Sequence, residues 1–155
     1  MKFPGLAQTV EHRQYMAEVG GSNPSPWTIF SHQKLGLSEC PYLERWVVNF
    51  RLFSIRLHHW MASDDQRHFH DHPWWYVSFV LSGSYIDRSL DGDVPRATHS
   101  IAAYKATHRH SVIIDRPCWT LLFTGRERRV WGFWVNGRFR KRSKYFFIFG
   151  HHPCE

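Results

Sequence analysis

Histidines gather in two short segments of the chain, with a spacing that could bring several imidazoles to one point. His68, His70 and His72 recur at every second position, and His108 and His110 repeat this spacing further along. Residues two apart share one face of an extended strand. Imidazole is the commonest protein ligand for divalent transition metals, so two such strands could surround one ion. A single His-x-His also occurs by chance on surface strands, and spacing alone leaves both readings open.

The second pair lies in a segment with an apolar face. Residues 106–114 predict a strand on which His108 and His110 share a side with Val112 and Ile114. An apolar face should look into the protein, since burial of apolar side chains drives folding. The pair is therefore expected to face an interior that a small molecule could also enter.

Short β-rich segments separated by turn residues follow one another from residue 45 onward. Their frequency indicates an all-β sandwich or barrel. We expect residues 85–88 to form a hairpin with 76–81, and 130–135 with 118–124. The predicted strands cover residues 46–53, 54–60, 76–81, 85–88, 106–114, 118–124, 130–135 and 145–149.

The N-terminal part has a different pattern. Residues 6–19 predict a short helix that ends at Gly20 and Gly21, and a Pro-rich loop follows. We therefore expect a helical or irregular extension over residues 1–44, and one barrel domain over residues 45–150.

The composition fits one packed domain. The chain has 155 residues, 43% hydrophobic and 17% aromatic, which argues against disorder. The chain has three cysteines, an odd number, and no CxxC motif, which argues against a disulfide framework or a cysteine zinc site. We therefore expect reduced thiols in a cytoplasmic protein. We identify no signal peptide, and no apolar stretch is long enough to span a bilayer.

The chain is basic, with a formal net charge of +7. Cations mixed with aromatic residues near the C-terminus could follow a phosphate backbone. The sequence contains no recognised nucleic-acid motif, so we expect a solvated surface and hold nucleic acid to be an unlikely partner. The residues concerned are Arg138, Arg140, Lys141 and Arg142.

Two stretches resemble the motifs of the cupin superfamily. Residues 70–74, His-Asp-His-Pro-Trp, followed by Gly83, resemble the first motif, and residues 105–110 resemble the second. Over residues 40–146 the chain is more closely similar to small, uncharacterised cupin-like proteins of bacteria and phages. The resemblance implies a double-stranded β-helix, or jelly-roll barrel, with one divalent metal inside.

The resemblance also implies a ligand set. His70 and His72 match the first two ligands, and His110 matches the second-motif ligand better than His108, with His68 also in reserve. Tyr76 stands where cupins usually carry a carboxylate, and the usual Gly and Pro before the second-motif histidine are absent. One alternative is a site of three histidines, as in thiol-dioxygenase-like cupins. In the other, His68 or Asp71 completes the set of ligands.

Such a site indicates a metal-dependent enzyme for a small molecule. Fe(II) would favour a dioxygenase, whereas Zn, Ni or Mn would act as a Lewis acid or water activator. Tyr85, Tyr104 and Arg56 are candidates for substrate contact, although packing is the commoner role of such residues. The alternative is a non-catalytic cupin module that binds a sugar or another small molecule. A homodimer is expected by analogy with cupins.

Overall fold

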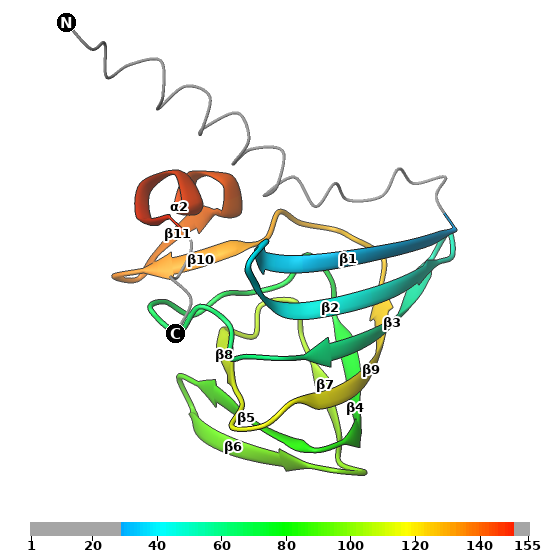
Figure 1. Cartoon of the computed structure of the whole chain (residues 1–155). Coiled ribbons are helices and arrows are strands. Elements are labelled where there is room, and N and C mark those ends of the chain that lie inside the picture. Colours follow the sequence, from blue (N-terminus) through cyan, green and yellow to red (C-terminus); the bar gives the residue numbers. More distant parts are fainter. Residues whose placement is uncertain (1–28, 151–155) are drawn as a thin grey trace, which may run out of the picture.

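A computed structural model describes residues 29–150, and these form strands and one short helix (Figure 1). The larger sheet has six antiparallel strands in the order β1-β2-β3-β9-β4-β7. Its strands are β1 Phe30–Leu37, β2 Cys40–Asn49, β3 Phe53–Trp60, β9 Cys118–Gly125, β4 Tyr76–Ser82 and β7 Ile101–Tyr104.

A three-stranded sheet lies beside it in the order β6-β5-β8. Two further strands pair with each other and lead into the helix α2 (Figure 1). These elements are β5 Ser84–Ser89, β6 Gly92–Ala97, β8 His110–Ile113, β10 Gly132–Val135, β11 Arg138–Lys141 and α2 Arg142–Phe149.

One core cluster joins the two larger sheets. Val80 of β4 and Cys118 of β9 pack with Tyr85 of β5 and Val112 of β8, and all four are buried. Because apolar side chains of both sheets meet in the interior, the sheets close on each other as in a jelly roll. The expectation of an all-β jelly-roll architecture is confirmed.

The strand β3 turns its polar face inward. Ser54 and His58 are buried, whereas Ile55 between them is exposed. On the outer side of the same sheet, Phe53 stacks on Phe123 with ring centroids 5.0 Å apart. An inward polar face on a central strand means that the barrel encloses a partly polar space, not only a packed core.

Two of the expected strand pairings are wrong. β5 does not form a hairpin with β4 but pairs with β6 and β8, while β4 pairs with β7 and β9. β9 lies between β3 and β4, and β10 pairs with β11 instead. The short turn between β4 and β5 therefore carries the chain from one sheet to the other, as corners of sandwiches often do.

The boundaries also differ from those expected. The larger sheet begins at Phe30, so the expected division between residues 44 and 45 falls inside β2. The helix expected over residues 6–19 lies outside the described residues. Only His110–Ile113 of the segment 106–114 is a strand, and residues 145–149 belong to α2 instead of a strand.

The helix α2 packs against β10 through part of its apolar run, whereas Phe147, Ile148 and Phe149 are exposed. Tyr145 and Phe146 are buried, and the Tyr145 ring stacks on Phe133 of β10 with centroids 3.8 Å apart. Tertiary packing thus overrides the β propensity of this aromatic run.

The cysteines differ from expectation in one respect. Cys40 is disulfide-bonded, so the expectation of three reduced thiols is wrong for this residue. Cys118 is a free thiol in the core.

The motif glycine Gly83 explains the corner between β4 and β5. It has φ +81°, and an added Cβ would lie 2.8 Å from the Cβ of Cys118. We predict that Gly83→Ala lowers the free energy of unfolding by about 2–4 kcal/mol, measured by urea denaturation, because both strain and overlap arise.

Gly137 is the matched control. It has φ +75°, but an added Cβ would meet nothing within 4 Å. Gly137→Ala should therefore lower the free energy of unfolding by only about 1 kcal/mol. Equal losses at the two positions would contradict a packing constraint at Gly83.

Candidate metal centre

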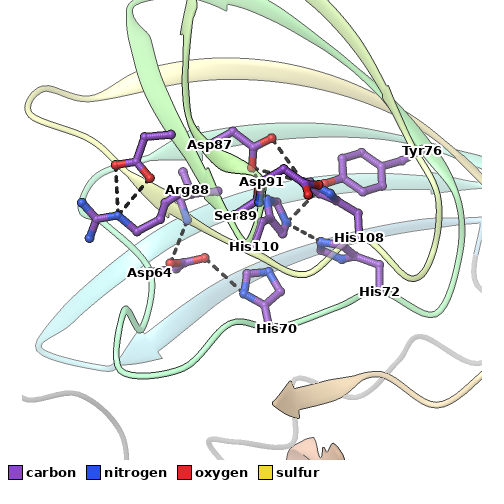
Figure 2. Close-up of polar contacts among 12 residues, drawn as sticks. Asp64, His70, His72, Tyr76, Asp87, Arg88, Ser89, Asp91, His108 and His110 are labelled. Atoms are coloured by element: carbon purple, nitrogen blue, oxygen red, sulfur yellow. Dashed lines mark hydrogen bonds and ion pairs between the residues drawn. The ribbon is translucent and has the colours of Figure 1, made fainter. Parts of the chain in front are cut away.

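Three imidazoles meet inside the barrel (Figure 2). One ring nitrogen from each of His70, His72 and His110 lies within 4.8 Å of the other two. The Nε2 atoms of His72 and His110 are 2.9 Å apart. These separations are near those around one ion with metal–nitrogen bonds of about 2.1 Å. The donor set of three imidazoles suits Zn, Fe, Ni or Cu.

Backbone hydrogen bonds bring the two histidine segments together. The His70 N–H donates to the His110 carbonyl at 2.9 Å, and the His110 N–H donates back at 3.0 Å. His70 also forms an isolated bridge with Phe133 of β10. The segment that carries His70 and His72 is thus fixed between β8 and β10, although it is not a regular strand itself.

Asp71 anchors this segment from the opposite side. It is fully buried and accepts hydrogen bonds from the Gly132 N–H and the Trp134 indole N–H at 3.2 and 3.0 Å. Arg129 completes its shell with an ion pair of 2.8 Å. These partners occupy both carboxylate oxygens, so the structure places Asp71 outside the histidine cluster.

Asp87 of β5 sets the orientation of His110. The Nδ1–H of His110 donates to Asp87 at 2.6 Å, which leaves the Nε2 lone pair facing His72 and the hydroxyl of Tyr76. A carboxylate behind a ligating imidazole fixes its tautomer and raises its basicity. His108 Nε2 lies 3.3 Å from the other oxygen of Asp87, and the His108 and His110 ring centroids are 4.9 Å apart.

The sequence analysis missed Asp87. The sequence did contain a signal for this residue. In the predicted strand 85–88, Asp87 is two positions from the candidate Tyr85 and so shares its face. A carboxylate on an inward face needs partners, and histidines are suitable ones.

The electrostatics keep the imidazoles neutral. Burial lowers the pKa of His70 and of His72 well below 6.5. Burial also lowers the pKa of His110, although Asp87 acts against it. Burial would raise the pKa of Asp87, but hydrogen bonds from His108 and His110 hold it low. Neutral imidazoles beside an ionised carboxylate are the protonation states that metal binding requires.

Two further oxygen groups border the cluster. The Tyr76 hydroxyl lies 3.2 Å from His110 Nε2, and burial raises the pKa of this phenol well above 10.0. An oxygen of Asp64 lies 3.4 Å from His70 Nδ1, and burial raises the pKa of this carboxyl as well. The other Asp64 oxygen accepts the Val112 N–H at 2.9 Å.

The other residues predicted for the site, His68, Tyr85, Arg56 and Tyr104, are not part of the three-histidine cluster. His68 is turned toward α2, where its Nδ1 lies 3.0 Å from the Tyr145 hydroxyl. Tyr85 and Arg56 line the barrel cavity. Tyr104 lies behind Tyr76, with ring centroids 4.8 Å apart.

The basic C-terminal run is split by the fold. Arg138 and Lys141 are exposed at the ends of β11, and Arg140 is half-buried. Arg142 lines the barrel cavity and lies over the Trp131 ring at 5.4 Å. The expected nucleic-acid surface stays a prediction that nothing in this geometry tests.

A cavity of about 800 Å³ opens beside the histidines. His70, His72 and His110 form part of its wall, together with apolar groups such as Trp74 and Leu122. A space of this size, with polar groups that converge among apolar side chains, is typical of small-molecule sites.

The chain is similar in structure to several solved proteins. HppE with Fe(II) has a TM-score of 0.52 and 8% identity, covering 61% of this chain and 56% of that chain. KdgF from Halomonas sp. has a TM-score of 0.50 and 13% identity, covering 62% of this chain and 88% of that chain. A putative ethanolamine utilization protein Q from Salmonella typhimurium has a TM-score of 0.51 and 8% identity, covering 63% and 80%.

These likenesses concern the fold. Other similar structures are described as cupin superfamily proteins. No protein-family model and no curated protein matches the chain. The barrel is cupin-like, as the sequence motifs implied. Among residues 29–150, no helix is long and apolar enough to cross a membrane.

The lowered histidine pKa values predict a pH-dependent stability of the metal-free protein. Above about pH 6.5 the buried imidazoles are neutral in both states, whereas below it only the unfolded chain takes up protons. The free energy of unfolding should fall by about 1.4 kcal/mol per pH unit for each such histidine as the pH drops.

Urea denaturation of the metal-free protein between about pH 7.5 and about pH 5.5 measures this slope. In His72→Gln, the fall of the unfolding free energy per pH unit should be smaller by the contribution of one histidine. A free energy of unfolding that does not change over this range would contradict neutral, buried imidazoles.

Proposed function

From its cupin-like barrel, we propose that the chain binds one divalent transition metal through His70, His72 and His110 and acts on a small molecule in the adjoining cavity. The observation that carries this proposal is the convergence of three ring nitrogens within 4.8 Å in the cavity wall. Three neutral protein ligands leave coordination positions free, as catalytic metal sites require.

A bound metal would supply Lewis acidity or, as Fe(II), a centre for oxygen chemistry. The chain's own residues supply the rest. Asp87 holds the His110 ring in one orientation. With His110 Nε2 engaged by a metal, the Tyr76 hydroxyl would lose its present partner and would be free to donate to a substrate oxygen in the cavity. Trp74 and Leu122, packed with Tyr76, keep bulk water from this side.

Fe(II) is the first metal to test, with Zn, Ni and Mn next. One of the similar structures, HppE, is described with Fe(II), which supports this order. Dioxygenase activity would require Fe(II)-dependent oxygen uptake. A non-catalytic binding module would hold the metal or a small molecule without any such uptake. A cytoplasmic homodimer stays a prediction.

The proposal predicts about one transition-metal ion per chain in protein purified without a histidine tag. His72→Ala should lose this metal, because the site then has only two imidazoles. Elemental analysis by plasma mass spectrometry measures the content.

His32→Ala is the matched control. His32 lies in β1 and bonds Glu44 at 2.7 Å, away from the cluster. This variant should keep the metal of the wild type. Equal metal content in wild type and His72→Ala would contradict the assignment.

The hydrogen bond from His110 to Asp87 predicts an effect on metal affinity without loss of a ligand. Asp87→Asn should weaken metal binding about 10- to 100-fold, because the imidazole loses its charged partner. Competition with a chelator of known affinity measures the change.

Asp93→Asn serves as the control, since Asp93 is exposed and pairs only with Arg88 among the described residues. It should bind metal as the wild type does. An Asp87→Asn variant with unchanged affinity would show that Asp87 does not support the site.

A further inference from the structure

Two arginines line the same cavity as the histidines. Arg45 of β2 and Arg56 of β3 both belong to its wall, as does His58, which is the register partner of Arg45 across the two strands. All three lie on the inward faces of their strands, so their polar ends meet in the interior and not in solvent.

Neither guanidinium is paired with a carboxylate among residues 29–150. Arg45 donates through Nε to the Gln33 side chain at 2.8 Å, and Arg56 through Nε to the Ser54 hydroxyl at 3.2 Å. Both partners are neutral, and within residues 29–150 neither arginine forms an ion pair. Glu127 lies in the same wall but beyond ion-pair distance of Arg56. A buried charge without a partner is costly, and such charges are normally compensated.

His58 gives an independent indication. Its side chain is only 5% exposed, yet neither ring nitrogen has a hydrogen-bond partner within the part of the chain that the structure describes. Buried polar groups in native proteins are almost always satisfied, so two unpaired nitrogens on a cavity wall point to a ligand. Burial, followed by the charges of Arg45 and Arg56, lowers the pKa of His58 and keeps it neutral.

The guanidiniums stay charged despite their burial. Desolvation lowers the pKa of Arg56 to about 9, and it also lowers the pKa of Arg45. The cavity wall thus carries positive charge at neutral pH beside a neutral imidazole that can donate one more hydrogen bond.

A stack of rings connects this wall to the histidine cluster. The guanidinium of Arg56 lies 4.6 Å from the Trp74 ring centroid, and Trp74 stacks on His72 with centroids 4.9 Å apart. A small molecule held at Arg56 would therefore lie beside the proposed metal ligand His72.

We propose that the cavity binds a small organic anion, whose carboxylate or phosphoryl group is held by Arg45, Arg56 and His58 while the rest of the molecule extends toward His72. This inference rests on the proposed function only for the direction in which the molecule extends. Arginine presents a planar fork of N–H donors that fits the oxygens of both groups. An uncharged sugar would leave the two buried charges uncompensated.

The test is saturable stabilisation by two probes, inorganic phosphate and succinate, on full-length protein as purified. Thermal unfolding is followed while ionic strength is held constant with potassium chloride, and glycerol serves as the uncharged probe. In the wild type, phosphate or succinate should raise the midpoint along a saturation curve, and glycerol should give no saturation.

Arg56→Gln should weaken the apparent affinity for the effective anion at least about tenfold, since it removes a charged donor. Arg45→Gln should act in the same direction. Arg56→Lys keeps the charge without the fork and should show an intermediate loss, which also covers a failure of Arg56→Gln to fold. Arg138→Gln, an exposed arginine of β11, removes the same charge elsewhere and should bind as the wild type does.

Equal midpoint shifts in wild type, Arg56→Gln and Arg45→Gln would overturn the proposal, as would the absence of saturation with both anions. His72→Gln separates this inference from the proposed function. Anion binding by a wild-type protein that contains no metal would support the anion site and contradict the proposed metal site. Metal binding by a protein that shows no anion binding would support the metal site and contradict the anion site.

Discussion

The reciprocal backbone hydrogen bonds between His70 and His110 hold the candidate site together. They join a loop that follows β3 to the start of β8, and these segments lie far apart in the chain. Without this bridge, the side chains of the two segments would have no reason to meet. The anchoring of Asp71 to Gly132 and Trp134 adds a third segment to the same point. The site therefore depends on backbone pairing first and on side-chain chemistry second.

The inward polar face of β3 makes the interior of the barrel partly polar. Ser54, Arg56 and His58 occupy positions that a sandwich core would fill with apolar residues. Rings of β3 and β9 instead stack on the outer side of the sheet, where His59 lies on Trp119 with centroids 4.2 Å apart. This arrangement leaves a partly polar cavity inside and an apolar layer on the outer face of the larger sheet. It explains how a chain with so many aromatic residues can enclose a space of about 800 Å³.

The sequence was sufficient for the all-β architecture and for the meeting of His70 and His72 with a second-motif histidine. Alternation and motif spacing are local signals, and both survive in the fold. The strand partners were not predictable in this way, because β4 and β5 are separated only by Gly83 and yet enter different sheets. Nor was the role of Asp87, since its importance arises from the register of β5 against β8, which brings it to His110. His68 is in phase with His70 in the sequence, but it directly follows a turn at residues 66–67 and contacts Tyr145 instead.

The buried guanidiniums of Arg45 and Arg56 make the stability of the folded protein depend on the binding of its ligand. An unoccupied cavity keeps two desolvated charges in the folded state, which lowers its stability relative to a fully compensated barrel. A ligand that binds only the folded state raises the unfolding free energy by mass action. Molecules without ligand would thus unfold and be degraded sooner, and the cellular amount of the protein would follow the supply of its own ligand.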